Sequence, residues 1–495
     1  MLLVTPKQMQ QLEQLTDAAG ISYARMMERA GYSLAACIRQ LVPEGRRAEF
    51  LAGTGNNGGD CYVAAYHLAL AGWEVQVTAP FGAPKTEISR NAAERAVQLA
   101  GVPVVPASGS FRQHADVIVD GLFGTGFRGE LPEGTDELLR IPEGAKLIAC
   151  DIPSGGNAST GSVSRFTAHA DASVTFGAVK LGMTQYPLRA HCGEILCMDI
   201  GIPADAPARL DPPAALLLEG EHVHLPELAP DTHKNRRGHL LIAAGSVRMR
   251  GACVLASQAA MRSGAGLATV ASAEAALQTI AVRVPECMCL PLQTDEEGFF
   301  RNTENHALLR HALTDKTALL IGCGMGMTEN TADLTKFLLS ESRCPVILDG
   351  DGLNAVCSCI ECIPRGRTIL TPHPAEAARL LGMTAAEVQS DRSAAAKLLA
   401  EKTGAVVALK GAGTIITDGI RTAVCTKGNA GMARAGSGDV LAGMTASLAA
   451  QGMELFESAC AAVYLHASAG DAAAEHLPEH YMLPQDLICN LQDVM

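Results

Sequence analysis

Hydrophobic residues occur along much of the chain as short runs, separated by longer stretches in which apolar residues recur every three or four positions. The short runs predict buried strands, and the longer stretches predict amphipathic helices. In the first half, strands are expected at 48–52, 75–79, 117–120, 147–151 and 173–176, and helices at 61–71 and 87–100. The segment 6–40 is helical in period and is expected to pack outside the sheet. Strands alternating with helices predict a parallel sheet covered on both faces.

The alternation stops between Ile202 and Arg237, where prolines crowd and a basic turn, 233–238, follows. Segments of this composition typically separate domains. From Leu240 a second α/β pattern begins, with a helix at 253–263 and later strands at 318–322, 346–349, 368–371, 406–410 and 414–417. The fold class predicted is therefore α/β, with two doubly wound domains at residues 1–213 and 214–495.

The composition of the chain limits the class of protein and the kinds of molecule that it is expected to bind. A chain of 495 residues exceeds what one hydrophobic core supports, and 48% hydrophobic against 18% charged residues indicates a globular protein. A net charge of -13 without long runs of like charge argues against nucleic-acid or membrane partners and favours small molecules. Sixteen scattered cysteines, with no secretory signal and no apolar run of membrane-spanning length, predict reduced thiols and a cytoplasmic location.

A glycine-rich stretch, GTGNNGGDCYVAA, begins at Gly53 like a phosphate-binding loop but carries Asp60 where such loops carry lysine. Two further turns, 120–130 and 151–155, also follow predicted strands. Ligands of open α/β sheets bind at the carboxyl ends of the strands, so the three turns are expected to share one crevice. Oxygens of Asn57, Asp120 and Ser154 suit a monovalent cation better than magnesium. The alternative is that these aspartates only cap turns and helices.

The second half carries its strongest motif at 429–443, which contains Gly436, Ser437, Gly438 and Asp439. Glycines at a helix start present backbone N–H groups to phosphate, and Asp439 could take a proton from a hydroxyl nucleophile. Here too the alternative is a helix cap. The turn 410–414 links two predicted strands and is a candidate phosphate contact. His373 lies between two prolines at the end of another strand.

The first set of motifs, with MMERAG at 26–31, resembles the NAD(P)HX epimerase domain over residues 1–202, which implies a Rossmann-like fold. NAD(P)HX denotes hydrated NADH or NADPH, and the implied reaction interconverts its R and S forms at C6 of the nicotinamide ring. The resemblance implies potassium at Asn57, Asp120 and Ser154, and we expect Asp151 to act as an acid/base group. The substrate contacts it implies are Asn56, Asn57, Gly58, Gly59, Asp60, Gly124, Thr125, Gly126, Phe127, Arg128, Gly129, Glu130 and Asp151. Cys61, and Gly156 with Asn157, depart from the family pattern.

The second set resembles the ribokinase-like superfamily, and more narrowly the NAD(P)HX dehydratase, over residues 214–495. The resemblance is carried by AAGSVRMRGA, SGAGLATV, IGCGMG, LDGDGLNA, TPHPAE, KGAGT and GSGDVLAG, with Ala375 and Ser437 as small departures. It implies that Ala252, Gly324, His373 and Asp439 contact the hydrate. It further implies that ADP binds at Lys410, Gly411, Ala412, Gly413, Thr414 and Gly438, with Mg²⁺ at its phosphates.

The resulting hypothesis is a bifunctional repair enzyme that epimerises NADHX and NADPHX and then dehydrates the S form, with ADP as co-substrate and AMP and phosphate as products. Asp439 would deprotonate the C6 hydroxyl, which then accepts a phosphoryl group and leaves as phosphate. A homo-oligomer is expected. The alternative is a vitamin or sugar kinase whose N-terminal domain is a non-catalytic binding module.

Overall fold

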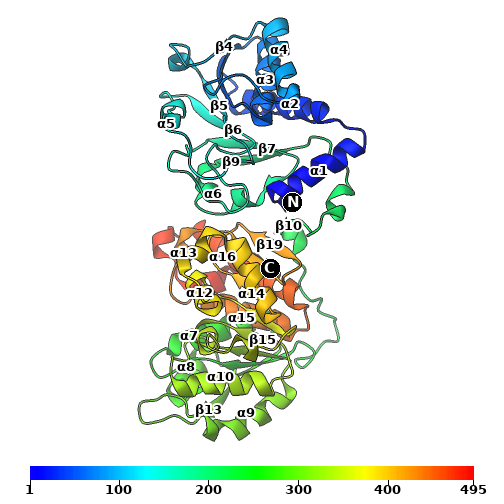
Figure 1. Ribbon diagram of the computed structural model, residues 1–495. Coiled ribbons are helices and arrows are strands. Elements are labelled where there is room, and N and C mark those ends of the chain that lie inside the picture. The colour runs from blue at the N-terminus through cyan, green and yellow to red at the C-terminus, as the bar shows by residue number, and fades with distance from the viewer. Residues whose placement is uncertain (495) are drawn as a thin grey trace. The chain divides into compact units, whose positions relative to one another are not determined.

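The computed structural model describes residues 1–494 and divides into two compact units, Met1–Leu216 and one that begins at Leu217 (Figure 1). The last residue of the predicted second domain, Met495, lies outside the described residues. The division falls inside the proline-rich segment where the alternation of strands and helices stops. Each unit is an α/β structure built on a largely parallel sheet, so the predicted fold class is confirmed.

The first unit contains a seven-stranded sheet in which every pair of neighbours is parallel. In spatial order its strands are β4 (Val104–Val105), β3 (Glu74–Thr78), β2 (Arg47–Ala52), β5 (Val117–Gly121), β6 (Lys146–Cys150), β7 (Ala172–Phe176) and β9 (Glu194–Met198). The chain runs outward from β2 in one direction and then returns to add β5 on the other side. The crevice at such a reversal is where open α/β sheets bind ligands.

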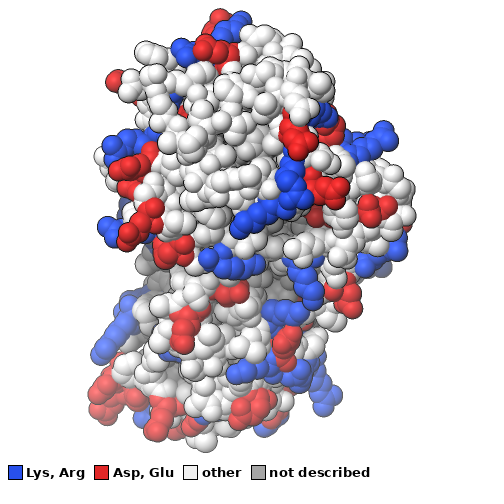
Figure 2. Space-filling model, turned by 45° about the horizontal axis from the view of Figure 1, so that its top comes forward, with Lys and Arg blue, Asp and Glu red and all other residues white. Residues whose placement is uncertain are grey.

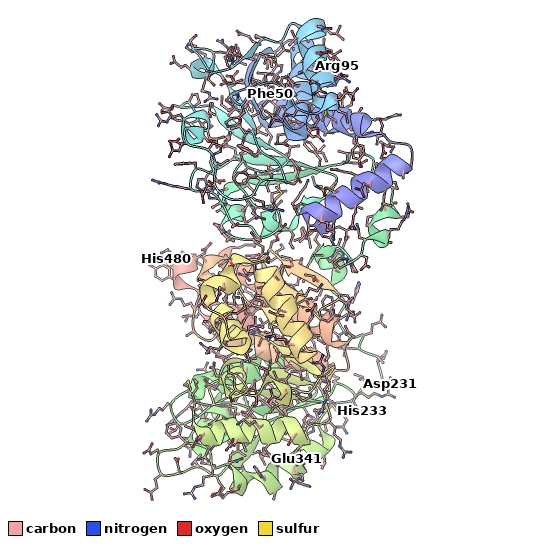
Figure 3. All side chains as sticks on the ribbon, in the orientation of Figure 1. Phe50, Arg95, Asp231, His233, Glu341 and His480 are labelled. Carbon is pink, nitrogen blue, oxygen red and sulfur yellow. The ribbon has the colours of Figure 1, made fainter. Side chains whose placement is uncertain are left out.

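Helices cover both faces of this sheet, and the interior of the unit is apolar. They are α1 (Pro6–Ala18), α2 (Tyr23–Leu41), α3 (Asn56–Leu70), α4 (Glu87–Ala100), α5 (Thr135–Leu138) and α6 (Leu188–His191). Phe50 on β2 is completely buried, whereas Arg95 on α4 lies at the outside of the unit (Figure 3). Short strands β1 (Leu2–Val4) and β8 (Val179–Lys180) pair in parallel, and β1 also pairs with β10 (Ala215–Leu217) in antiparallel register.

The second unit is built on a longer sheet with the same kind of reversal. In spatial order its strands are β13 (Met288–Leu292), β12 (Leu267–Ala273), β11 (His239–Ala243), β14 (Ala318–Ile321), β15 (Val346–Leu348), β16 (Thr368–Leu370), β17 (Val406–Leu409), β18 (Thr414–Thr417) and β19 (Thr422–Cys425). The pairs from β13 to β17 are parallel, and β17, β18 and β19 form antiparallel pairs. The reversal lies between β11 and β14, and ligands of open α/β sheets bind outside the carboxyl ends of the strands at such a reversal.

The helices of the second unit are α7 (Arg250–Arg262), α8 (Glu274–Arg283), α9 (His306–Ala312), α10 (Glu329–Glu341), α11 (Gly350–Ala355), α12 (Pro374–Leu381), α13 (Ala385–Ser390), α14 (Arg392–Thr403), α15 (Ser437–Ala450), α16 (Leu455–Ala474) and α17 (Pro484–Asn490). Helices α15 and α16 are buried along most of their length, because both are made of alanine, leucine and other small or apolar residues. This interior position fixes the start of α15 against the carboxyl ends of the central strands.

Among the element boundaries that differ from the sequence-based expectation, two lie at the predicted site of the first unit. Helix α3 begins at Asn56 rather than Cys61, because the first turn of a helix leaves its N–H groups free of helical partners and so tolerates Gly58 and Gly59. Strand β6 ends at Cys150 rather than Asp151, whose φ of 66° is the only positive value at a non-glycine position in residues 1–494. Aspartate adopts this left-handed conformation more readily than most residues.

On the face shown in Figure 2, acidic and basic side chains are interspersed. Over residues 1–494, no helix is both long and apolar enough to cross a membrane.

Candidate active sites

The three predicted loops of the first unit meet at one pocket of about 660 Å³. Its lining includes eight of the predicted substrate contacts, namely Asn56, Asn57, Asp60, Gly124, Thr125, Gly126, Phe127 and Asp151. Gly58 and Gly59 lie buried behind them, where a Cβ on Gly58 would stand 2.0 Å from the Gly53 carbonyl oxygen. The close approach of α3 to the end of β2 therefore requires glycine at position 58.

The remaining predicted contacts, Arg128, Gly129 and Glu130, lie in an exposed loop outside this lining. The Glu130 carboxylate accepts hydrogen bonds from the Ser164 hydroxyl at 2.7 Å and from the Arg165 backbone N–H at 3.0 Å. In this structure Glu130 thus ties two loops together instead of facing the pocket.

Asp151 is held in place by a lysine that the sequence analysis did not single out. The Lys180 ammonium forms an ion pair with the Asp151 carboxylate, and its side chain is only 1% exposed. Lys180 Nζ also donates to Thr175 Oγ1 at 2.9 Å and to the Phe176 carbonyl at 3.0 Å. The same carboxylate oxygen of Asp151 accepts hydrogen bonds from Thr175 Oγ1 at 2.8 Å and from the Phe176 N–H at 3.2 Å. Asp151 is therefore an oriented carboxylate with a buried counter-ion.

Asp60 faces the same pocket in a different environment. Its side chain forms no cap on α3, and it receives no hydrogen bond from any residue in the range 1–494. Burial raises its pKa well above the usual value, and the nearby charges of Asp151 and Glu13 raise it further. Burial also raises the pKa of Glu13, on α1, with Asp151 acting in the same direction. The capping role considered for Asp60 is excluded by this geometry.

The three residues predicted to hold potassium lie beside this pocket. Buried Asp120 accepts hydrogen bonds from the Ser154 hydroxyl at 2.6 Å and from its N–H at 2.8 Å, while burial raises the Asp120 pKa. The Asn57 amide nitrogen is buried without a hydrogen-bond partner in the described chain. Amide oxygen and nitrogen are interchangeable on rotation, so this amide can present an oxygen to a cation. A carboxylate, a hydroxyl and an amide in one place fit a monovalent ion.

Aromatic side chains line one part of the first pocket. Phe123 lies between Phe81 and Phe127, with ring centroids 5.5 and 5.3 Å away. Lys85 lines the same pocket. Flat rings and an ammonium group provide stacking surfaces and a phosphate contact, which are the features that a dinucleotide requires.

In the second unit, Asp439 lies in the first turn of α15. It directly follows Gly438, and Gly436 stands immediately before the helix. Gly436 takes a φ of 102° as the residue before the helix, and the α15 N-terminus has no side-chain cap. The Ser437 hydroxyl in this turn is buried without a hydrogen-bond partner in the described chain. Burial raises the pKa of Asp439 to about 7, and the charge of Asp349 raises it as well. A carboxyl with this pKa is suited to general base catalysis near neutral pH.

Asp349, directly after β15, is paired with Lys410 and lies near Asp439. Lys410 Nζ lies 2.7 Å from Asp349 Oδ1, which also accepts a hydrogen bond from the Thr371 hydroxyl at 2.7 Å. Ligand atoms of Cys323, Asp349 and Asp439 all lie within 4.8 Å of one another. The structure thus brings Lys410 to the start of α15, where a Cβ on Gly438 would be 3.2 Å from Nζ. Sequence reasoning missed Asp349, although its place after a buried strand was a usable signal.

The remaining predicted substrate contacts of this unit lie around the same strand ends. Gly324 (φ 65°) follows β14, and a Cβ there would be 2.7 Å from the Cβ of Ala252 on α7. His373 precedes α12, and its Nδ1 accepts hydrogen bonds from the backbone N–H groups of Ala375 and Glu376 at 3.1 and 3.3 Å. Burial lowers the His373 pKa, with Lys410 acting in the same direction. A neutral imidazole therefore serves as the helix cap.

The turn 410–414, predicted to contact ADP, is organised from behind by Arg392 at the start of α14. The Arg392 side chain is buried, and its guanidinium donates to the carbonyls of Leu409 at 3.1 Å, Lys410 at 3.3 Å and Gly413 at 3.4 Å. Burial lowers its pKa to about 10. Gly411 is required beside it, because a Cβ there would be 2.3 Å from a guanidinium nitrogen.

The side chains near Asp439 do not form a magnesium cage. Mg²⁺ prefers six oxygen ligands in octahedral geometry, and the cluster of Cys323, Asp349 and Asp439 contains a thiol and a carboxylate already bonded to Lys410. The residues present fit a magnesium ion only if phosphate oxygens of a bound nucleotide supply most of its ligands.

Both units are α/β structures with carboxylates and a lysine gathered at the strand ends, and sequence comparison gives the family. A model described as NAD(P)H-hydrate dehydratase matches residues 240–493, and a model described as YjeF-related protein N-terminus matches residues 23–182. The bifunctional NAD(P)H-hydrate repair enzyme Nnr of Coxiella burnetii is 35% identical over 99% of both chains. That of Escherichia coli is 32% identical over 97% of this chain and 91% of its own.

Solved structures resemble the second unit. A Bacillus subtilis ADP/ATP-dependent NAD(P)H-hydrate dehydratase, co-crystallised with ATP and Mg²⁺, is 29% identical with a TM-score of 0.50, covering 57% of this chain and 97% of its own. A ribokinase-like superfamily protein of Enterococcus faecalis has a TM-score of 0.51 at 25% identity, covering 57% of this chain and 96% of its own. The chain belongs to the family of bifunctional NAD(P)H-hydrate repair enzymes.

Proposed function

We propose that this protein repairs hydrated NADH and NADPH by two reactions, one in each unit. The first interconverts the R and S hydrates, and the second dehydrates the S hydrate to NADH or NADPH. Membership of the repair family over the full chain supports this function, and it confirms the prediction from the motifs. The alternative of a vitamin or sugar kinase with a non-catalytic module is not favoured.

The epimerase site is proposed to be the pocket at the ends of β2, β5 and β6. Asn56, Asn57 and the turn Gly124–Phe127 would contact the dinucleotide, with Asp151 at the reacting carbon. The row of phenylalanine rings and Lys85 support binding of a flat base and a phosphate. Gly58 and Gly59 would act by allowing the close turn. The exposed loop with Arg128, Gly129 and Glu130 is proposed to contact the outer part of the nucleotide.

The dehydratase site is proposed to be the strand-end crevice around Asp439. Ala252, Gly324 and His373 would border the hydrate, while Lys410, Gly411, Ala412, Gly413, Thr414 and Gly438 would border ADP. The free N–H groups at the start of α15 would stabilise the transferring phosphoryl group. Asp439 would take the proton of the C6 hydroxyl as its oxygen attacks phosphorus, and AMP would leave. The phosphorylated oxygen then departs as phosphate, which restores the dihydronicotinamide ring once a proton is lost from C5.

The proposal also includes two ions, potassium and magnesium, and ADP as the phosphoryl donor. Potassium would be held by Asn57, Asp120 and Ser154, and would shield charge near the dinucleotide. Magnesium would be held mainly by phosphate oxygens and would neutralise their charge. ADP is proposed as the donor, and comparing ADP with ATP at equal concentration tests this choice.

Two further expectations concern the cell and the assembly. All sixteen cysteines are free, which supports a reducing compartment such as the cytoplasm. A homo-oligomer is proposed, and light scattering after size-exclusion chromatography measures it directly.

The observation that carries the dehydratase proposal is Asp439, a buried carboxyl with a pKa near 7 beside the uncapped start of α15. The test is to incubate the protein with purified (S)-NADHX and ADP and to follow formation of NADH, with Asp439→Asn as the variant. Lys402→Met, on the solvent side of α14, is the matched control. Recovery of NADH by the wild type and the control, but not by the Asp439 variant, is expected. If the Asp439 variant matches the wild type, the assignment is wrong.

A further inference from the structure

Asp151 and Asp60 face one pocket but lie in opposite electrostatic environments. Asp151 has a buried ammonium, a hydroxyl and a backbone N–H on its carboxylate. Each of these donors stabilises the charged form of a carboxyl group. Asp60 has no donor among the described residues and has two further carboxyl groups near it, those of Asp151 and Glu13. Both the lack of donors and the like charges stabilise its neutral form.

The charged groups that act on Asp60 come from three other elements. Glu13 approaches from α1, Asp151 from the end of β6, and Lys180 from the end of β8. Burial raises the pKa of the Cys150 thiol, which precedes Asp151 in the chain, and the charges of Asp60 and Asp151 act in the same direction. Lys180 is the only cation in this group, and its ammonium is bonded to Asp151 and not to Asp60. The one positive charge that acts on Asp60 is therefore bonded to the other aspartate.

Backbone geometry supports a special role for Asp151. Its φ of 66° turns the chain at the end of β6, although most non-glycine residues avoid this region. The turn directs the carboxylate toward Lys180, Thr175 and Phe176. Backbone conformations of this cost persist where the surroundings hold them in place, often at functional sites.

We propose that the epimerase site works with two carboxyl groups, Asp60 as the general acid and Asp151 as the general base, with Lys180 as the counter-ion that holds the Asp151 carboxylate in place. The inference rests on the proposed epimerase function and assigns roles within that site. Lys180 is a positioning residue, since it acts through Asp151. Glu13 contributes negative charge that keeps the proton on Asp60.

The chemical step needs no external reactant except water. Asp60 donates its proton to the C6 hydroxyl, and the C6–O bond breaks so that water leaves with the bonding electron pair. The lone pair of N1 forms a C6=N1 double bond and leaves a cation. A water molecule on the opposite face attacks C6, the N1=C6 pair returns to nitrogen, and Asp151 accepts the proton that this water loses. Transfer of that proton from Asp151 to Asp60 restores the site, and the reverse sequence converts the other epimer.

The experiment measures R to S interconversion of purified NADHX without ADP, using the full chain. Asp60→Asn and Asp151→Asn should each lower kcat by about 10²-fold or more with little change in KM, which is the range for loss of an acid or base. Asp17→Asn, at an exposed position of α1, is the matched control and should interconvert the epimers as the wild type does. Thermal unfolding of each variant, followed by circular dichroism, reports whether the first unit is folded, and dehydration of (S)-NADHX with ADP reports on the second unit.

The positioning role of Lys180 is tested by a measurement that loss of folding would not change in the same way, the pH profile of epimerisation. Lys180→Met removes the buried counter-ion of the Asp151 carboxylate, so the acid limb of the epimerisation pH profile should move to higher pH. Lys180→Arg should restore much of this shift. Lys146→Met, which removes an exposed ammonium 2.9 Å from Asp171, is the control and should leave the profile in place. An unmoved acid limb in Lys180→Met would overturn the positioning role.

The C6–O cleavage is tested separately by isotope. In water enriched in oxygen-18, each molecule converted from R to S should carry one labelled oxygen at C6, measured by mass spectrometry against a sample without enzyme. Unlabelled product would overturn the water exchange step, and an Asp60→Asn rate within about threefold of wild type would overturn the acid assignment. Failure of the wild type to interconvert the epimers at all would instead reject the proposed epimerase function.

Discussion

The protonation of Asp439 should set the pH range in which the second site works. Its pKa is raised from 3.8 to about 7, by burial first and by Asp349 next. Such a group is about one-tenth ionised at about pH 6, half ionised at about pH 7 and nine-tenths ionised at about pH 8. If the ionised form takes the proton of the C6 hydroxyl, kcat/KM for dehydration should rise about tenfold per pH unit below about pH 7 and level off above about pH 8.

Substitutions near Asp439 should shift the pH profile of dehydration in directions that can be predicted. Asp349→Asn removes a charge that raises the Asp439 pKa and also frees Lys410, whose charge lowers it. Both effects should move the rise of kcat/KM with pH to lower pH. Lys410→Met removes the lowering charge and should move the limb to higher pH. Asp439→Asn should lose about 10²- to 10⁴-fold in kcat, with no remaining limb near neutral pH.

The assay follows NADH formation from purified (S)-NADHX and ADP in buffers of constant ionic strength, because salt screens the charges involved. Initial rates are taken at low and at saturating hydrate so that kcat and kcat/KM are separated. A wild-type profile that is flat between about pH 6 and about pH 8 would refute the reasoning. Shifts of the same sign in Asp349→Asn and Lys410→Met would also refute it.

Three further outcomes are expected. The Arg392 guanidinium holds backbone carbonyls in and next to the 410–414 turn. Arg392→Met should therefore raise the KM for ADP about tenfold or more in steady-state kinetics, with a smaller effect on kcat. Arg392→Lys should recover part of this loss. Asp120→Asn should make epimerisation insensitive to potassium, whereas the wild type should be faster in potassium than in a choline buffer of equal strength; equal rates of the wild type in both would exclude the cation. Because the pKa of Asp439 is higher in the folded state, its contribution to stability falls as pH rises from about 4 to about 7. Thermal unfolding at about pH 8 should therefore show Asp439→Asn more stable than the wild type by about 1–3 kcal/mol. A stability difference that does not change with pH would contradict that linkage.

Much of the fold followed from the periodicity of hydrophobic residues. Helix α4 has the predicted bounds Glu87–Ala100, and the strands near 48–52, 117–120 and 414–417 lie where the apolar runs are. The convergence of the three N-terminal loops also followed, since parallel strands bring their carboxyl ends to one edge. The shorter strands β1, β8 and β10 were missed, because runs of two or three residues carry no periodic signal.

The site was predictable where its chemistry lies in local motifs and not where it depends on distant partners. Asp151 and Asp60 stand in glycine-rich turns, but Lys180 lies in an apolar stretch and meets Asp151 only through the short strand β8. Arg392 begins a helix, a position where arginine is usually solvated, and its burial depends on the turn that it supports. The capping alternative for Asp60 and Asp439 was open in the sequence and is excluded by side-chain geometry.

The central claim is that one chain performs both repair reactions. The most direct measurement supplies the purified protein with a mixture of R and S NADHX of known proportion and excess ADP, and follows NADH to completion faster than the epimers interconvert without enzyme. The account predicts that the wild type converts both epimers completely, and that Asp60→Asn stops at the amount of S hydrate supplied. A wild-type reaction that also stops at the S share would contradict the account.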